Sequence, residues 1–298
     1  MNFLIIYDAE NVAQKNTLAD FLAEKEIVSS AFLLSENSPV QLDSVPSKFE
    51  GVTHCAILDK KLLGKNFSFA LGFALGNGMC VYALKTGMIK NSEGFKNLRS
   101  FGTFEELDSF FKKNIDKIVE EDVKRRAWKK LFDSGNPFMP DSFAIHVEKD
   151  NREIVQTYID AGMSLNERTS LGTPMLNVAI RAEQVDEVKW ILQHEVDLDA
   201  VSKDRGYSAL MDCVWKKNLE LAKILVEKGV NLDFTSTDGQ SALVLAVGEG
   251  NVKMVELLAE AGANPDKADA LGMSAYGYAK LFKRDDIVQI LEKYHHEK

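Results

Sequence analysis

The apolar positions of residues 140–298 recur with a nearly constant period. Four glycines lie 34, 33 and 33 residues apart, at Gly172, Gly206, Gly239 and Gly272. After each glycine come a short turn and a helical run with an apolar anchor, at Leu176, Leu210, Leu243 and Tyr276. The same runs carry small residues where neighbouring units would touch, at Ala179, Cys213, Ala246 and Ala279. The pattern predicts a stack of similar helical units.

A second helical run follows each anchor and carries a bulky apolar pair. The pairs are Ile191/Leu192, Leu225/Val226 and Leu257/Leu258, and several of these runs close on a glycine, as at Gly162, Gly229 and Gly262. A single pair of short helices cannot bury its apolar faces, so neighbouring units must cover one another. We therefore expect the stack, and not the single unit, to be the folded object.

A unit of about 33 residues with one turn and two helices resembles the ankyrin repeat. The most faithful copy begins Asp238-Gly239-Gln240-Ser241-Ala242-Leu243 and ends Ala261-Gly262-Ala263-Asn264-Pro265-Asp266. Two departures weaken single turns: Glu195 replaces a turn glycine, and the Thr-Pro pair of the motif remains only at Thr173-Pro174. The resemblance implies an all-α solenoid of about five repeats over 138–298. Its first repeat starts near Pro140, and its last helix, over 287–291, caps the stack.

Strand-like and helical runs alternate in the first third of the chain. The strand-like runs lie at 3–7, 28–34, 55–58, 80–84 and near 100–102. This alternation predicts an α/β domain with a parallel, flavodoxin-like sheet and helices on both faces. A strongly helical segment then runs to about Phe132, and Gly135 and Pro137 break it. We expect a nucleotide-binding-like α/β domain over 1–125, the end of a linker helix over 126–137, and the repeats over 138–298.

Composition and charge narrow the functional classes. With 298 residues and 45% hydrophobic content, the chain can form two cores. A net charge of -9 argues against nucleic acid as a partner, and the basic residues of 124–130 are expected to form a solvated helix face. Three cysteines in apolar runs favour a reducing compartment. No leader or membrane span is evident, so we expect a cytoplasmic protein.

Polar residues follow two of the predicted strands. Asp8 and Asn11 come directly after the first, and Asp59 follows the third. Ligands of open parallel sheets bind at such strand ends. The Asp-x-x-Asn spacing resembles metal-dependent nucleases of the PIN-like class, in which several carboxylates share a cation. Alternatively, Asp8 and Asn11 cap a loop or the next helix, and then no metal or other cofactor is implied.

A second resemblance covers residues 55–84. Gly72-Phe73-Ala74 is similar to a Gly-aromatic-Ala element of nucleoside 2-deoxyribosyltransferases and TIR-like domains. The resemblance places Ala70 where those enzymes carry a nucleophilic glutamate. A methyl group cannot attack an anomeric carbon, so the fold would be shared and the chemistry would not. Alternatively, this is an ordinary buried helix in which Gly72 allows close packing.

The repeats favour a protein-binding function, as a scaffold, adaptor or regulatory protein. Positions without an obvious framework role on the first helices are the candidate partner-binding residues: Arg181, Asp212, Trp215, Lys216, Leu245, Glu249 and Tyr278. An exposed Trp215 between Arg181 and Lys216 would suit an acidic partner, whereas a Trp215 packed on a neighbouring helix would shift attention to the turns near Asp204 and Asp238. The alternative function is a nucleoside- or nucleotide-processing hydrolase or transferase, or a nuclease, that uses Asp8, Asn11 and Asp59, with the repeats as a targeting arm.

Overall fold

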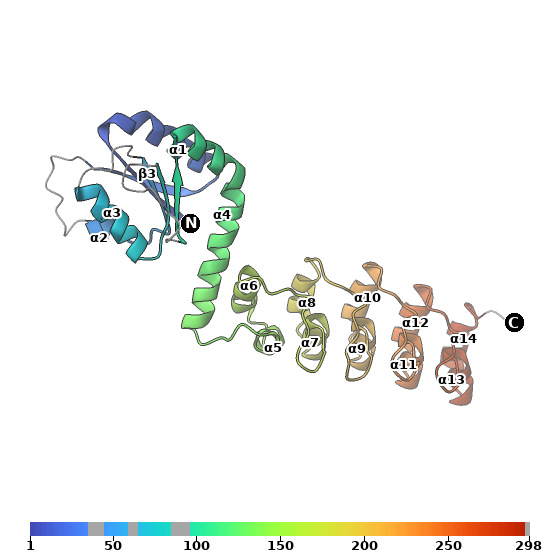
Figure 1. Cartoon of the computed structure of the whole chain (residues 1–298). Coiled ribbons are helices and arrows are strands. Elements are labelled where there is room, and N and C mark those ends of the chain that lie inside the picture. Colours follow the sequence, from blue (N-terminus) through green and yellow to red (C-terminus); the bar gives the residue numbers. More distant parts are fainter. Residues whose placement is uncertain (35–44, 59–64, 85–95, 296–298) are drawn as a thin grey trace. The chain divides into compact units, whose positions relative to one another are not determined.

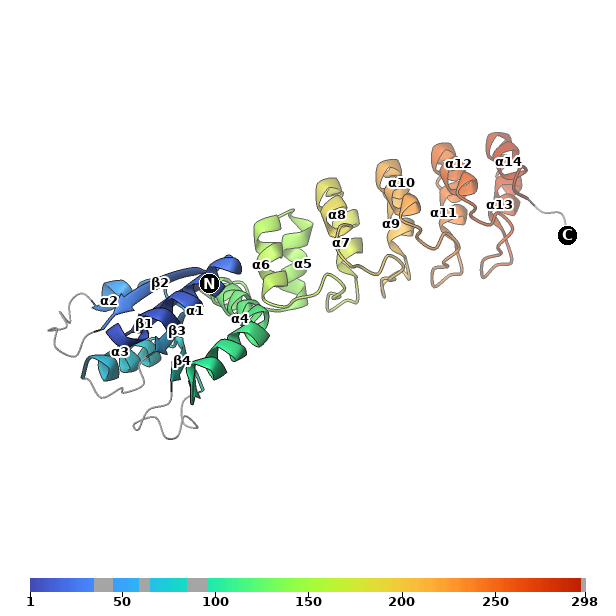
Figure 2. The same ribbon diagram turned by 90° about the horizontal axis from the view of Figure 1, so that it is seen from above.

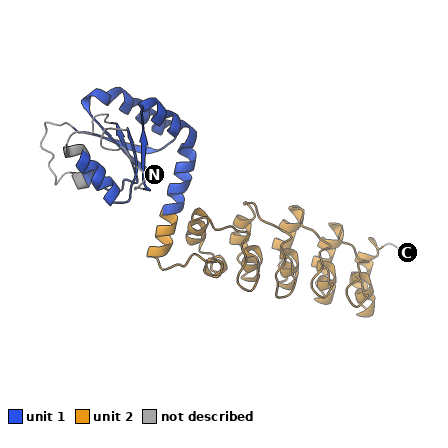
Figure 3. Ribbon diagram, viewed as in Figure 1, with its two compact units in different colours: residues 1–125 blue, residues 126–298 orange. Residues whose placement is uncertain are grey.

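The computed structural model describes residues 1–34, 45–58, 65–84 and 96–295. The chain forms two compact units, Met1–Arg125 and Arg126–Lys298, which are coloured blue and orange in Figure 3. Within the described ranges, no helix has both the length and the apolar character needed to cross a membrane.

The first unit is built on a parallel sheet of five strands, as the alternating pattern predicted (Figure 1). Its order is β2-β1-β3-β4-β5, and every neighbouring pair is parallel. The strands are β1 (Asn2–Tyr7), β2 (Val28–Leu33), β3 (His54–Leu58), β4 (Cys80–Leu84) and β5 (Leu98–Phe101). The strand order changes direction between β1 and β3, where Leu4 pairs with Cys55.

Side chains alternate between the two faces of this sheet because successive residues of a strand point to opposite sides. On one face Leu4, Ile6, Cys55 and Ile57 pack with α3 (Lys65–Gly76). On the other, Phe3, Ile5, Ala56 and Leu58 pack with α1 (Val12–Glu24) and the first half of α4 (Phe104–Asp133). Two shorter helices, η1 (Ala9–Asn11) and α2 (Val45–Lys48), complete the described elements of this unit. β1, β3 and β4 are buried on both faces, which explains their nearly continuous apolar sequences, whereas the edge strand β2 is largely exposed.

Helix α4 continues past Arg125 into the second unit without a break. It ends at Asp133, and Gly135 follows with a φ of 71°. Its last turns belong to the packing of the second unit, since Trp128 lies 4.1 Å from Phe138, centroid to centroid, and its Nε1 donates to the Ala161 carbonyl at 3.0 Å. Residues 126–133 therefore pack against the first helix pair of the stack.

The second unit is a row of antiparallel helix pairs (Figures 1 and 2). The first helices of the pairs are α5 (Pro140–Glu148), α7 (Met175–Arg181), α9 (Ala209–Trp215), α11 (Ala242–Gly248) and α13 (Ala275–Leu281). The second helices are α6 (Arg152–Asp160), α8 (Val185–Ile191), α10 (Leu219–Glu227), α12 (Val252–Glu260) and α14 (Asp285–Leu291). One continuous apolar core runs through all ten helices.

The recurring glycines have a backbone reason. Gly172, Gly206, Gly239 and Gly272 all have φ between 67° and 79°. At Gly239 a Cβ atom would also lie 2.7 Å from the backbone nitrogen of Ala270 in the next unit. Glu195 does not have a positive φ, and the helix before it, α8, is two residues shorter than α6, α10 and α12. The missing glycine thus shortened one helix and left the period intact.

Hydrogen bonds between equivalent turns hold neighbouring units in register. Asn166 Oδ1 accepts from the backbone of Asp197, Asp199 Oδ1 from Asn231, and Asp233 Oδ1 from Asn264, at 2.8 to 2.9 Å. The sequence separations are 31, 32 and 31 residues. Equivalent positions of successive units therefore stand in rows across the stack.

Candidate functional site

Exposed apolar side chains of the stack gather on one side, which we call the first-helix face. It consists of the C-terminal ends of α5, α7, α9, α11 and α13, together with the turns that precede these helices. Over the described residues 140–295, the large hydrophobic side chains that are exposed are Ile145, Leu171, Trp215, Leu271, Leu281 and Phe282. All six lie on these helix ends or turns, and α6, α8, α10, α12 and α14 contribute none. This face, unlike the opposite one, retains apolar area that the fold does not bury.

Trp215 lies near the middle of the first-helix face, and 47% of its surface is exposed. The alternative that its ring is buried against a neighbouring helix is therefore wrong. The guanidinium of Arg205 lies 5.3 Å from the centroid of the ring. Arg205 precedes Gly206 in the turn, at the position that Leu171 and Leu271 occupy in other units. This repeat position is the signal by which the sequence could have identified Arg205.

Arg181 and Asp212 belong to the framework, which corrects the expectation that they are free positions. Asp212 is 0% exposed and accepts from Arg181 Nε at 2.8 Å and from Asn177 Nδ2 at 2.7 Å. Arg181 also donates to both carboxylate oxygens of Asp204, at 2.9 and 3.2 Å. Burial raises the pKa of Asp212, while the bonds from Asn177 and Arg181 oppose the shift. The network links two neighbouring repeats. Because Arg181 is paired with two carboxylates of its own chain, its charge is largely compensated and it is a poor binding site for an acidic partner.

The remaining candidates divide between surface and core. Lys216 forms an ion pair with Glu183 at 3.0 Å, and Glu249 forms one with Lys217 at 3.0 Å. Tyr278 is half-buried, and its hydroxyl donates to Asp269 Oδ2 at 2.7 Å. Leu245 is buried among its neighbours, so its expected surface role is corrected as well. Trp215, Lys216, Glu249 and Tyr278 are thus the candidates that reach the surface.

A groove of about 420 Å³ opens on the first-helix face between α5 and α7. Helix residues and turn residues line it together, including Ile145, Val178 and Leu171. Asp141 and Glu148 add carboxylates at its α5 side. Because first helices and preceding turns border one hollow, they form a single continuous surface.

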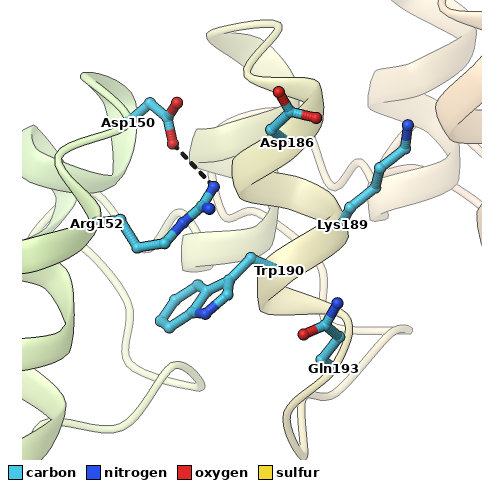
Figure 4. A pocket seen from close by; sticks show the side chains of 6 residues that line it. All are labelled: Asp150, Arg152, Asp186, Lys189, Trp190 and Gln193. Atoms are coloured by element: carbon cyan, nitrogen blue, oxygen red, sulfur yellow. Dashed lines mark hydrogen bonds and ion pairs between the residues drawn. The ribbon is translucent and has the colours of Figure 1, made fainter.

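The second-helix side carries a different hollow, of about 510 Å³, between the first two helix pairs (Figure 4). There Arg152 bonds to Asp150 and to Glu187, each at 3.3 Å, and its guanidinium lies 5.8 Å from the Trp190 centroid. Glu187 is fully buried, and its Oε1 has no hydrogen-bond partner. Burial and the neighbouring Asp150 raise the pKa of Glu187 to about 7, against the opposing effect of Arg152. The contact between Arg152 and Glu187 ties two repeats together.

The end of β1 has the geometry of a helix cap. Asp8 Oδ1 accepts from the backbone nitrogens of Glu10 and Asn11, each at 2.9 Å, and from Asn11 Nδ2 at 2.6 Å. These bonds satisfy the first turn of η1, as the capping alternative predicted. Asp59 lies outside the described residues, so the structure gives no distance between its carboxylate and that of Asp8. Within the described residues, no group of three or more His, Cys, Asp or Glu could hold a metal ion.

Ala70, at the position that the deoxyribosyltransferase resemblance assigns to a nucleophile, lies on the inward side of α3. It is 1% exposed and packs in the same core as Leu4, Ile57 and Val81. A side chain at this position faces the sheet and not a ligand. The structure thus favours the alternative of an ordinary helix packed on the sheet. The expected close packing at Gly72 is wrong, because Gly72 is exposed and a Cβ atom there would meet nothing within 4 Å.

The chain matches the family of ankyrin repeats (3 copies) over residues 143–236 and 228–298. Together with the helix pairs and turn glycines, this match shows that the chain belongs to the ankyrin repeat family. An ankyrin repeat-containing protein of Treponema pallidum (strain Nichols) is 36% identical over 217 residues, which cover 72% of this chain and 73% of that protein. The similar region is longer than the second unit and must include part of the first. Ankyrin repeats imply protein–protein interaction in general.

Proposed function

We propose that this chain is a scaffold, adaptor or regulatory protein that binds its partner on the first-helix face, with Trp215 as the central contact. The observation that carries the proposal is the placement of the exposed apolar side chains, all six on one side of the stack. A stack that used every apolar residue for its own stability would leave no such bias. Exposed aromatic side chains at the centre of a surface are also the residues that contribute most to protein–protein affinity.

An acidic partner remains part of the proposal, but a different cation supports it. Arg181 and Lys216 pair with carboxylates of their own chain. Arg205 is exposed beside Trp215 and forms no ion pair within the described part of the chain. A carboxylate of the partner could therefore bind Arg205 while an apolar group contacts the indole.

For the first unit we propose a non-catalytic role, as a structural or ligand-sensing module. Its strand order is that of flavodoxin-like sheets, whose ligands bind at the reversal between β1 and β3. The capping role of Asp8 and the burial of Ala70 support a role without chemistry. We further propose that the protein acts in a reducing, cytoplasmic compartment without nucleic acid, in keeping with three free thiols and a net charge of -9.

Site-specific photo-crosslinking tests the proposed surface. A photoreactive phenylalanine analogue replaces Trp215 in one variant and Lys223, an exposed residue of α10, in a matched control. We expect a discrete protein adduct from position 215 in extracts of the source cells, and none from position 223. The same adduct from both positions, or from position 223 alone, would contradict the proposed face.

A further inference from the structure

Three positions in one row of the stack leave an open position between two exposed apolar side chains. Trp215, Gly248 and Leu281 are the last residues of α9, α11 and α13, and they are spaced by 33 residues. Trp215 and Leu281 are exposed, and Gly248 between them is exposed too. The ion pair between Lys217 and Glu249 shows that the ends of α9 and α11 lie side by side. The row therefore has two large apolar side chains with an open position between them.

Neither the backbone nor the packing requires glycine at 248. Its φ is not in the left-handed region, unlike that of Gly250 two residues later, which is 63°. A Cβ atom at Gly248 would meet nothing within 4 Å. Glycine is less favourable than alanine in a helix because it loses more backbone freedom on folding. The equivalent positions Glu148, Arg181, Trp215 and Leu281 all carry large side chains. The glycine therefore keeps space open at a cost in stability and without a structural reason.

We propose that the open position over Gly248 receives an apolar side chain of the protein partner, and that a carboxylate next to it binds Arg205. This inference rests on the proposed function and specifies its partner. The inserted side chain would lie between the indole of Trp215 and the side chain of Leu281. Phe282, which is half-exposed and stacks on Tyr278 at 5.7 Å, extends the apolar surface next to Leu281.

Arg205 supplies the charge that selects a carboxylate. Its guanidinium already lies 5.3 Å from the centroid of the Trp215 ring, so it stands beside the aromatic end of the row. Asp238 occupies the equivalent turn position of the next unit and would repel an acid that approached from that side. The carboxylate of the partner is therefore placed on the α9 side of the inserted group. An apolar residue followed or preceded by Asp or Glu is the recognised chemistry.

Selection of random peptides against the full chain tests this inference. Short peptides displayed on phage are enriched on the purified protein, and the affinities of the recovered sequences are measured with synthetic copies. We expect enriched peptides to share an aromatic or large aliphatic residue beside Asp or Glu. Gly248→Leu, which fills the open position, should weaken them by about tenfold or more. Lys223→Leu, which adds the same side chain on the opposite side, should leave affinity unchanged.

Further variants separate the inference from the function on which it rests. Arg205→Gln should weaken only those peptides that carry the acid, and a peptide with Asn in place of its Asp should lose this sensitivity.

If peptides depend on Trp215 but tolerate Gly248→Leu, the first-helix face is the binding surface and the proposed insertion over Gly248 is wrong. If neither Trp215→Ala nor Gly248→Leu changes any affinity, the proposed function fails as well. A dimer of the free chain that Gly248→Leu dissociates would make a second copy the occupant and overturn the proposal. Melting temperatures show that each variant is folded, and we expect that of Gly248→Leu to be no lower than that of the native chain.

Discussion

Asp212 and Glu187 are both fully buried carboxylates that meet an arginine, but their surroundings differ. Asp212 receives hydrogen bonds from Asn177 and Arg181, so its charge is compensated inside the stack. Glu187 receives one bond from Arg152 at 3.3 Å and lies beside a second acid, Asp150, while each of the two carboxylates keeps one oxygen without a hydrogen-bond partner. Removing a single partner from a buried ion pair is expected to cost about 3–5 kcal/mol. Burial raises the pKa of both carboxyls, and that of Glu187 reaches about 7.

The raised pKa of Glu187 predicts a pH dependence of stability. Its pKa is about 7 in the folded chain and close to 4.5 when unfolded, so the folded state binds the additional proton between these values. The free energy of unfolding should decrease as pH rises from about 4.5 to about 7, with a contribution that approaches about 1.4 kcal/mol per pH unit. Denaturant titrations of the native chain across this range measure the slope.

Glu187→Gln isolates that contribution from those of the other acids. We expect the variant to have a flatter dependence of unfolding free energy on pH than the native chain between pH 4.5 and 7. Asp186→Asn, which changes the neighbouring exposed acid, is the matched control and should keep the native slope. Equal slopes in the native chain and Glu187→Gln would show that folding does not raise the pKa of Glu187.

Single residues were the least predictable from the sequence. Trp215 and Arg181 both occupy helix positions that the repeat framework leaves open, and the sequence gives no sign that one is exposed and the other is bound to Asp212 and Asp204. The difference arises because the long side chain of Arg181 extends to the carboxylates of the next repeat. Asp8 could be foreseen as a cap, because a short acid directly before a helical turn commonly accepts its free backbone N–H groups.

At the level of elements, the stack depends on contacts between neighbours. The final pair covers the apolar side of the pair before it: Ile287 and Leu291 of α14 are fully buried, as is Leu258 of α12. We expect deletion of residues 270–298 to uncover α11 and α12, reduce solubility and lower the melting temperature. Light scattering and thermal unfolding of the truncated chain measure both effects.

A matched change distinguishes loss of a cap from loss of chain length. Deletion of residues 296–298 alone removes the terminal residues but keeps Ile287 and Leu291, and should leave stability unchanged. A truncation at 270 that stays monomeric with the native melting temperature would show that the final pair is not a cap.

Element boundaries in the stack were largely predictable because the apolar period and the turn glycines mark the same positions. The glycines at 172, 206, 239 and 272 are needed for left-handed backbone, so they identify the turns directly. The parallel sheet was also predicted, since strands buried on both faces are continuously apolar. The passage of α4 across residue 125 was also predicted, since the helical segment was expected to run to about Phe132. The packing of Trp128 on Phe138 was not evident, because it joins residues of different elements.

For the whole molecule, binding and catalysis make opposite predictions about the first unit. We expect the purified chain to cleave neither nucleosides nor nicotinamide dinucleotide, because Ala70 provides no nucleophile and lies in the core. Product analysis by chromatography, with an active nucleosidase as positive control, measures this. Turnover that disappears in Asp59→Asn would establish the enzyme alternative instead.

The central claim is that a protein partner binds the first-helix face around Trp215. Hydrogen–deuterium exchange of the full chain, with and without the partner identified by crosslinking, tests it most directly because every described segment is measured at once. We expect slower exchange in the turns before α9, α11 and α13 and at the C-terminal ends of these helices. The second helices α8, α10 and α12 and the sheet of the first unit should be unchanged. Protection confined to those second helices, or to residues 1–125, would contradict the account.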